Sequence, residues 1–265
     1  MPEGHTIHRL ARDLARDLGG HALSVSSPQG RFADAAALDQ TGLLRTEAIG
    51  KHLLLHFRAR RVVHIHLGLF GRCYRRKNPA PEPRSTTRLR LVGPAYTWDL
   101  VGPTCCELLG PAPLTKLRKR LGVDPLAKKP NVELAWQRVS QTKRAIGAVL
   151  LDQSVFAGIG NVYRAELLFL TQLHPERRAC DVGRVAFDEL WSRAKSLLAL
   201  GVEERRIVTV PHATSKRLKR VEALYVYKRR ICRLCNGPIA KLVCGGRPIY
   251  ACERCQPLGR ELGAP

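Results

Sequence analysis

The feature that most constrains the fold of this chain is a pair of CxxC motifs near its C-terminus. Cys232 and Cys235 form the first motif, Cys252 and Cys255 form the second, and sixteen residues lie between them. Two such motifs at this separation can present four thiolates to one Zn²⁺ ion from two small hairpins. The surrounding segment, at about 225–258, has too little apolar mass to fold unaided, so we expect one structural zinc ion per chain to stabilise it.

The remaining five cysteines do not belong to this ligand set. Cys244 lies between the motifs, and we expect it to have no metal-binding role because four ligands already complete a tetrahedral site. Disulfide-bonded or incidental cysteines are the alternative interpretation of the motifs. The other four cysteines are expected to be reduced and buried: Cys73, Cys105, Cys106 and Cys180.

The second constraint is electrostatic. The 265 residues include 45 Lys and Arg against 22 Asp and Glu, which gives a formal net charge of +23. The densest basic segment, 216–230, holds seven positive residues and one negative residue. Such an excess repels itself and favours a polyanionic partner, of which nucleic acid is the natural candidate. Each basic cluster taken alone is also consistent with a solvated surface.

No stretch approaches the roughly 18 apolar residues that a membrane span needs. The first residues carry Glu3, His5, His8 and Arg9 where a signal peptide would have an apolar core. We therefore expect a cytoplasmic protein without a membrane partner. Its length suits two modest domains, or one domain with an appendage.

The first half of the chain is expected to be mostly β, with one helix at its start. Residues 1–20 are predicted to form a helix that ends at Gly19-Gly20, because apolar residues recur at helical spacing at Ile7, Leu10, Ala11, Leu14 and Leu18. Short apolar runs predict strands at 53–57, 62–67, 88–93, 95–100 and 104–109, the first two joined by a basic turn. Asp124-Pro125 marks a boundary.

Helices dominate after that boundary, at about 132–140, 143–151, 161–171 and 187–200. The Gly-rich turn AGIGN precedes the third helix, and Asn161 is predicted to cap it. Free N–H groups at a helix start favour an anion, so this corner is a candidate phosphate site, although an ordinary helix–turn–helix corner fits as well. Arg247, in GGRP between the CxxC motifs, is expected at a tight β-turn, where it either reaches a phosphate or is simply exposed.

The start of the chain, PEGHTIHR, allows two interpretations. Pro2 is a favourable first helical residue, because its missing N–H would be unsatisfied there in any case. Alternatively, removal of the initiator methionine bares the secondary amine of Pro2, which then acts as a positioned nucleophile. An α-amino group titrates near ~8, so part of it is unprotonated at neutral pH.

Three stretches, in order, resemble the formamidopyrimidine-DNA glycosylase/endonuclease VIII family of base-excision repair enzymes: PEGHTIHR, DQSVFAGIGNVYRAE and CRLC…GGRPIYACERCQ. The resemblance covers essentially the whole chain. It implies an α+β multidomain fold in three parts. These are a helix with a two-layer β-sandwich at 1–124, a helical domain with a helix–two-turn–helix motif at 125–224, and a zinc finger with a short tail at 225–265.

The resemblance also implies roles for individual residues. Pro2 would attack C1′ of a damaged nucleotide, Glu3 would act as general acid/base at the sugar ring oxygen, and Lys51 would bind a phosphate next to the lesion. Asn161 and Arg247 would grip the backbone while the nucleotide flips out.

Leu69 and Phe70 would fill the hole that the flipped nucleotide leaves, unless they pack in the core behind the hairpin. Leu69-Phe70 resembles the Leu-Tyr pair of endonuclease VIII, whereas Gly68 stands where that enzyme has a glutamine wedge. The only methionine is Met1, and the segment at 202–227 is basic and poor in glycine, unlike the purine-lesion branch.

These features predict a bifunctional DNA glycosylase/AP lyase for oxidised pyrimidines, which nicks the strand by β,δ-elimination. The expected partner is damaged double-stranded DNA, with single-stranded DNA as a further candidate, and the expected state is a monomer in a bacterial cytoplasm. Two alternatives stay open. One is the same chemistry on oxidised purines, and the other is a non-enzymatic, zinc-containing DNA-binding relative.

Overall fold

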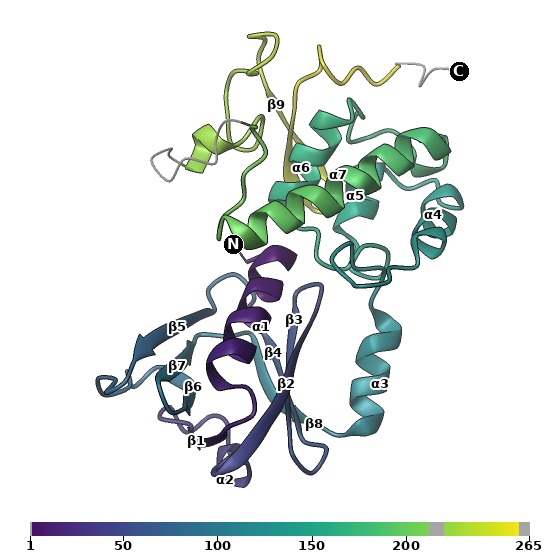
Figure 1. Ribbon diagram of the computed structural model, residues 1–265. Helices are drawn as coiled ribbons and strands as arrows, with labels where there is room; N and C mark the ends of the chain where they lie inside the picture. The colour runs from purple at the N-terminus through teal and green to yellow at the C-terminus, as the bar shows by residue number, and fades with distance from the viewer. Residues whose placement is uncertain (1, 212–219, 260–265) are drawn as a thin grey trace. The chain divides into compact units, whose positions relative to one another are not determined.

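The computed structural model describes residues 2–211 and 220–259, and its helices and strands carry the labels of Figure 1. The chain divides into two compact units, residues 1–120 and 121–265. The three-part division at 124/125 and 224/225 stays a prediction. Residues 216–219 of the basic segment lie outside the described residues. Within the described part of the chain, no helix is long and apolar enough to cross a membrane.

The first unit begins with α1 (Gly4–Leu18), which packs against strands β2 and β3. The helix buries the apolar stripe that the sequence predicts and ends before Gly20, whose φ is 81°. It begins at Gly4, with Glu3 as the N-cap. Pro2 therefore precedes the helix, and the prediction that the helix starts with the first residues is wrong by one turn.

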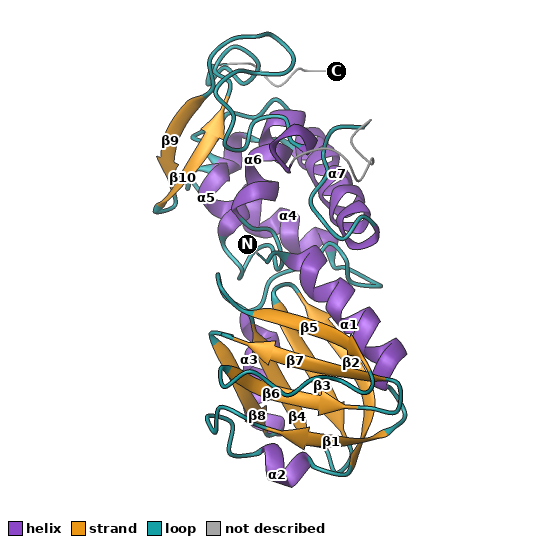
Figure 2. Cartoon of the chain, turned by 90° about the vertical axis from the view of Figure 1, so that its left-hand side faces the viewer, coloured by secondary structure: helices purple, strands orange, loops and turns teal. Residues whose placement is uncertain are grey.

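Eight strands of the described chain form this unit's antiparallel β-sandwich, in the order β5-β7-β6-β1-β2-β3-β4-β8. In β1, Ala22 and Leu23 pair with β2, whereas Ser24 to Ser26 pair with β6, so this strand belongs to both layers (Figure 2). The strands are β1 (Ala22–Ser26), β2 (Thr41–Ile49), β3 (His52–Phe57), β4 (Val62–His66), β5 (Arg72–Lys77), β6 (Thr87–Val92), β7 (Tyr96–Val101) and β8 (Cys105–Leu109).

The core of this unit lies between the two layers and α1. Leu14, Leu53, Leu91 and Trp98 are buried in it. The predicted hairpin is present as β3 and β4, joined by the basic turn. Two further helices, α2 (Ala35–Leu38) and α3 (Pro111–Arg120), are not predicted from the sequence. α2 is a single turn, and α3 buries only Leu117, so neither has an apolar stripe to signal it.

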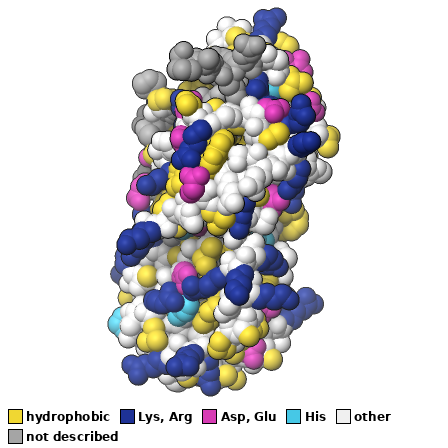
Figure 3. All heavy atoms as spheres, turned by 90° about the vertical axis from the view of Figure 1, so that its right-hand side faces the viewer, with side chains coloured by type: hydrophobic (Ala, Val, Ile, Leu, Met, Phe, Trp, Pro, Cys, Tyr) yellow, Lys and Arg dark blue, Asp and Glu magenta, His cyan; other side chains and the backbone are white. Residues whose placement is uncertain are grey.

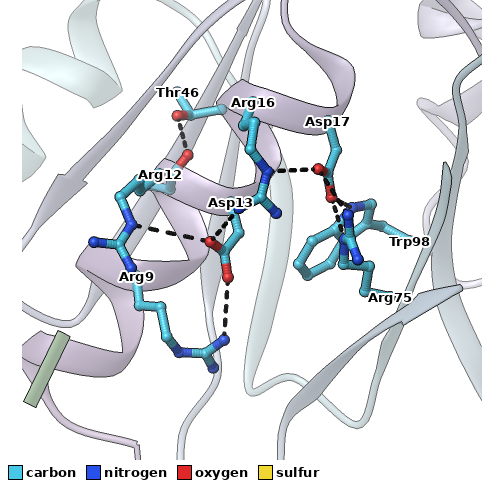
Figure 4. A network of polar contacts seen from close by, with 9 residues as sticks. Arg9, Arg12, Asp13, Arg16, Asp17, Thr46, Arg75 and Trp98 are labelled. Atoms are coloured by element: carbon cyan, nitrogen blue, oxygen red, sulfur yellow. Dashed lines mark hydrogen bonds and ion pairs between the residues drawn. The ribbon is translucent and has the colours of Figure 1, made fainter. Parts of the chain in front are cut away.

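Two buried carboxylates lie on α1, and one of them ties the helix to the sheet (Figure 4). Asp13 lies 3.4 Å from the guanidinium of Arg16. Asp17 accepts hydrogen bonds from the side chains of Arg16, Arg75 and Trp98. Burial raises the pKa of Asp17, but these hydrogen bonds outweigh it and hold the pKa below its ordinary value. Since Arg75 is on β5 and Trp98 is on β7, the carboxylate joins α1 to the layer that contains both strands.

The second unit contains four α-helices, two short 3₁₀ helices and a two-stranded hairpin among its described residues. Val149, Ile159 and Leu167 share a core with Cys244 and Ile249 of the hairpin, so the hairpin packs on the helices. The predicted helices are present within a few residues of their expected bounds. The elements are α4 (Val132–Ser140), α5 (Ile146–Leu151), α6 (Asn161–Leu170), η1 (Ala179–Asp181), α7 (Arg184–Glu203), η2 (Arg220–Ala223), β9 (Ala240–Cys244) and β10 (Arg247–Ala251).

The cysteines differ in part from the sequence-based expectation. All nine cysteines lie in the described part of the chain, and none of them forms a disulfide there. Those expected to be buried are instead partly exposed: Cys73, Cys105, Cys106 and Cys180. Three of them lie on β5 and β8, where one face of the sheet or an edge strand leaves access to solvent.

Candidate functional site

The start of the chain places Pro2 directly before a buried acidic residue. Pro2 is half-buried immediately before α1, and Glu3 has no solvent exposure. The backbone of Glu3 is extended, and its carbonyl accepts the N–H of Thr6 at 2.9 Å, which starts the first helical turn. A carboxylate at a helix start is favoured by the helix dipole. Pro2 therefore directly precedes a residue whose carboxyl group is buried.

Lys51 lies in the tight turn between β2 and β3, after Gly50, whose φ is 57°. Both strands pack against α1, and the Thr46 hydroxyl donates to the carbonyl of Ala11 at 2.6 Å. Figure 1 shows the start of α1 and this turn at the same end of the first unit. The structure therefore brings Lys51 to the end of the unit at which Pro2 lies.

The loop after β4 presents two apolar side chains to solvent. Leu69 is 56% exposed and Phe70 is 83% exposed. Because β2, β3 and β4 are antiparallel neighbours, this loop leaves the sheet at the same end as the Lys51 turn. The exposure rules out the alternative that both side chains pack in the core behind the hairpin.

Gly68 gives that loop its shape. Its φ is 64°, and a Cβ there would lie 1.8 Å from the Thr104 hydroxyl oxygen. The backbone N–H of Thr104 also donates to the carbonyl of His66 at 2.9 Å. A side chain at position 68 would adopt a left-handed backbone conformation and clash with the Thr104 side chain, so glycine is favoured there.

In the second unit, the structure corrects the predicted cap of α6. Gly160 is the N-cap, and Asn161 is the first helical residue. The Asn161 side chain is buried, and its Nδ2 donates to the carbonyl of Pro248 at 2.9 Å. Its Oδ1 has no hydrogen-bond partner among the described residues. The capping prediction fails because the side chain turns towards the hairpin, a partner 87 residues away in sequence.

Arg247 lies at the hairpin turn that the sequence predicts. Gly245 and Gly246 join β9 to β10 with φ of 61° and 71°, which are typical of a type I′ turn. Arg247 follows them as the first residue of β10, and its side chain is exposed. Since Asn161 bonds to the adjacent Pro248, the structure brings the two predicted phosphate ligands of this unit close together.

The four CxxC cysteines also lie together. Their sulfurs lie within 4.8 Å of one another, with Sγ–Sγ distances of 3.8 Å for Cys232–Cys255 and 3.4 Å for Cys235–Cys252. Zn–S bonds of about 2.3 Å place tetrahedral sulfurs about 3.8 Å apart, so the donor set fits a metal ion. The backbone N–H of Gly237 lowers the pKa of Cys235 to about 7. Cys244 lies outside this cluster and contacts the Pro175 carbonyl instead.

The positive charge is spread over the surface. Lys and Arg side chains are frequent on the face drawn in Figure 3, and Asp and Glu are fewer. Basic residues project from the β3–β4 turn and from α3, including Arg58, Arg60, Lys116 and Lys119. Both units therefore carry exposed cations.

Sequence relatives identify the chain. The profile of the formamidopyrimidine-DNA glycosylase N-terminal domain matches residues 1–97, and that of its H2TH domain matches residues 121–212. Endonuclease 8 1 of Mycobacterium tuberculosis is 43% identical over 267 residues, which cover 97% of this chain and 100% of that protein. The chain belongs to the formamidopyrimidine-DNA glycosylase/endonuclease VIII family. Members of the family are DNA glycosylases with AP lyase activity, and this chain is such an enzyme.

A second sequence relative and a solved structure of similar fold were also found. The formamidopyrimidine-DNA glycosylase of Herpetosiphon aurantiacus is 28% identical over 284 residues, covering 97% of this chain and 100% of that protein. A complex of wild-type Lactococcus lactis Fpg with DNA containing N7-benzyl-Fapy-dG has a TM-score of 0.79 and 20% identity, covering 97% of this chain and 100% of that chain. The predicted fold class is confirmed: an N-terminal β-sandwich, an H2TH domain and a Cys₄ cluster that fits a zinc finger.

The glycosylase has two functional supports that the sequence analysis missed, Arg164 and Glu166 on α6. Arg164 has no exposure and donates to the carbonyls of Gly147 and Cys244 at 2.9 Å and of Arg247 at 3.1 Å. It therefore fixes the hairpin turn that carries Arg247. The signal was two charges within the otherwise apolar run NVYRAELLFL, but their partners are far away in sequence.

Glu166 holds the chain that leads into the finger. Its fully buried carboxylate accepts the backbone N–H groups of Tyr225, Val226 and Tyr227 at 2.7–2.9 Å and the hydroxyl of Thr209 at 2.5 Å. Burial raises the pKa of Glu166 despite these hydrogen bonds. The described end of the basic segment is thus anchored to α6.

Proposed function

We propose that this glycosylase removes oxidised pyrimidines from double-stranded DNA through a Schiff base on Pro2 and then nicks the strand by β,δ-elimination. The observation that carries the proposal is the half-buried Pro2 next to the fully buried Glu3 at the start of α1. Lys51 and the Leu69-Phe70 loop lie at the same end of the unit, which supports one shared substrate-binding surface.

The chemistry follows from the amine. After removal of the initiator methionine, the free base of Pro2 attacks C1′, and the bond from C1′ to the base breaks. The base leaves with the bonding electron pair and takes up a proton. The attached nitrogen loses its proton, and its electron pair then opens the sugar by breaking the C1′–O4′ bond. Because Pro2 is a secondary amine, the iminium ion formed in this way is positive without a further proton, so it withdraws electrons from the sugar. Loss of the C2′ proton then expels the 3′ phosphate, and a second elimination expels the 5′ phosphate.

Glu3 is proposed as the acid that protonates the ring oxygen as the sugar opens. Its burial supports this role, because it keeps the carboxyl group shielded from bulk water at the start of α1. The backbone hydrogen bond from Thr6 to the Glu3 carbonyl supports a fixed position for the acid relative to the amine.

The remaining residues are proposed to hold the DNA. Lys51, Asn161 and Arg247 would contact phosphates on either side of the lesion. The Asn161 amide carries two N–H groups and gives one to the Pro248 carbonyl, so the other is the donor proposed for a phosphate. Leu69 and Phe70 would enter the space that the flipped nucleotide leaves. Their exposure supports this, since apolar side chains so accessible to water gain by insertion between bases.

The Cys₄ cluster is proposed to bind one structural zinc ion. Cys232, Cys235, Cys252 and Cys255 would be its ligands. The zinc ion would cross-link the finger and so stabilise its fold, and it would take no part in the reaction. The ion would thereby stabilise the hairpin that presents Arg247.

The pyrimidine preference rests on two features. The relative at 43% identity is named an endonuclease 8. The chain also has the Leu69-Phe70 pair, and Met1 is the only methionine in its sequence. Gly68 has no side chain where endonuclease VIII has a glutamine wedge, so void filling would be left to Leu69 and Phe70.

The test is borohydride trapping on duplexes that carry an abasic site, thymine glycol or 8-oxoguanine opposite cytosine. We expect a covalent adduct that peptide mapping locates at residue 2, with thymine glycol trapped faster than 8-oxoguanine. Pro2→Gly should lower trapping by at least about 10-fold, because a primary amine gives a less electrophilic adduct at neutral pH.

Glu3→Gln is the matched variant. It keeps the amine, so it should still trap a preformed abasic site while losing excision of an intact lesion. Unchanged trapping by Pro2→Gly would contradict the nucleophile assignment. Faster trapping of 8-oxoguanine would instead favour the purine branch, and no trapping at all would favour a DNA-binding relative without chemistry.

A further inference from the structure

A second group of metal-binding side chains lies in the first unit, on strands β4 and β8. His64 on β4 is paired with Glu107 on β8, and Cys105 stands two residues before Glu107 on the same face of the strand. The Nδ1 of His64 is 2.9 Å from Oε1 of Glu107 and 3.5 Å from Sγ of Cys105. All three donor atoms lie within 4.8 Å of one another. We propose that these residues bind a second zinc ion, separate from the Cys₄ cluster.

The donor set and its spacing support a metal ion. Imidazole nitrogen, thiolate sulfur and carboxylate oxygen are the three ligand types that Zn²⁺ takes in proteins. With bonds of about 2.0–2.3 Å, tetrahedral ligand atoms lie about 3.3–3.6 Å apart. The His64–Cys105 separation is already in this range, and the His64–Glu107 pair needs to open by only about 0.4 Å.

His52 supplies the support that a metal-bound histidine needs. Its Nδ1 lies 2.8 Å from Nε2 of His64, and both rings are buried. A metal-ligating imidazole directs one nitrogen at the ion and donates the N–H of the other to a neighbour, which fixes its orientation. His64 has this arrangement, with Nδ1 towards Cys105 and Glu107 and Nε2 towards His52.

The site has room for a fourth ligand. A cavity of about 230 Å³ opens beside His64 and Glu107 and is closed on its other side by α3 residues that include Lys116, Leu117 and Arg120. A site with three protein ligands and an open position is the arrangement in which zinc keeps a water or a small anion.

The charges around the site are compatible with zinc binding, although Lys116 and Arg120 lie nearby. Zinc binding displaces the thiol proton of Cys105, and the thiolate and the Glu107 carboxylate together neutralise the two positive charges of the ion. The loaded site would then be neutral, and Lys116 and Arg120 would favour an anionic fourth ligand. An ion here would also clamp β8, the edge strand of the sheet, to β4.

The test counts zinc in the full-length protein. The protein is saturated with Zn²⁺, freed of excess metal by gel filtration, and measured by mass spectrometry of the metal and by competition with a chromophoric chelator. Two zinc ions per chain are expected for the unchanged protein. One is expected for Cys105→Ser and for His64→Gln, and at least about 10-fold weaker binding of the second ion is expected for Glu107→Gln.

Cys106→Ser is the matched control. Cys106 is the neighbour on the same strand, but its side chain packs against the interior core, so this variant should keep two ions. One ion per chain in the unchanged protein, or loss of an ion from Cys105→Ser and Cys106→Ser alike, would overturn the proposal.

Borohydride trapping separates this inference from the proposed reaction, because none of the three ligands takes part in that reaction. Cys105→Ser should trap an abasic site as fast as the unchanged protein does. If Cys105→Ser fails to fold, the zinc content of His64→Gln and Glu107→Gln tests the proposal instead. Two tightly bound zinc ions in both of these variants would overturn it.

Discussion

At the scale of single residues, Arg164 shows how a buried charged side chain can hold an exposed residue in position. Its guanidinium reaches α5 and both strands of the hairpin, and no water can replace it because the side chain is fully buried. Hydrogen bonds from a charged donor are among the stronger contributions to folding, and their loss leaves buried acceptors unpaired. The position of the exposed Arg247 thus depends on a fully buried arginine.

We predict that Arg164→Met lowers the free energy of unfolding by about 2–4 kcal/mol, because it removes the buried hydrogen bonds from a charged donor to the carbonyls of Gly147, Cys244 and Arg247. Arg164→Lys should recover part of the loss. Urea denaturation followed by circular dichroism measures the change. Arg193→Met removes an exposed ion pair and should change stability by less than about 0.5 kcal/mol. Equal effects of the two substitutions would contradict this role of Arg164.

The sequence predicted the arrangement of individual residues where residue type and local spacing are enough to fix it. The Cys₄ cluster follows from spacing, and the exposure of Arg247 follows from the Gly-Gly turn before it. Prediction failed for Asn161, because the choice between capping a helix and bonding to Pro248 depends on a hairpin far away in sequence. The arrangement of His64 and Cys105 was likewise hidden, since strand pairing and not spacing brings them together.

At the scale of elements, Glu47 on β2 joins three segments. Its carboxylate accepts hydrogen bonds from His56 on β3 at 2.9 Å, from Arg45 at 2.9 Å and from Arg118 on α3 at 2.8 Å. The hydrogen bond from His56, followed by those of the arginines, lowers the pKa of Glu47 to about 2 despite partial burial. This contact ties α3 to the sheet, although α3 buries little apolar surface.

The lowered pKa predicts a pH dependence. A carboxyl group whose pKa falls on folding stabilises the protein above its unfolded pKa, and that contribution disappears as the pH drops towards the folded value. Glu47→Gln should therefore cost about 1 kcal/mol at pH 7 and almost nothing near pH 2, measured by denaturant titration at each pH. Glu133→Gln, an exposed control, should show no such trend. A constant difference between pH 7 and pH 2 would contradict the assignment.

Elements with strong periodicity were predicted well, and weakly patterned ones were not. The apolar stripe of α1 and the continuous apolar run of β3 are clear in sequence and buried in the structure. β2 is half-exposed along most of its length, and α3 contains two prolines and one buried residue, so local pattern could not identify them. Tertiary contacts such as those of Glu47 decide these elements.

At the scale of the whole molecule, the net charge of +23 predicts salt-sensitive DNA binding. Binding to an undamaged duplex should weaken by about 10³–10⁵-fold between 50 and 200 mM salt if six to ten phosphates are contacted. Fluorescence anisotropy measures the slope of log K against log salt. Lys51→Gln should reduce the slope by about 1, whereas Lys195→Gln, an exposed lysine without an assigned contact, should not. A slope near zero would contradict a phosphate-dominated interface.

The connection between α1 and β1 has a consequence for how such chains can evolve. Three residues, 19–21, separate the helix from the strand that both layers share, and the N–H of Gly20 is bonded to the Leu43 carbonyl. An inserted or deleted codon here would rotate α1 about its axis or shift it along the sheet, and would carry the first residues of the chain with it. The segment 78–86 between β5 and β6 has no such tie to the helix. Length variation among functional descendants should therefore gather in that loop and spare the helix–strand junction.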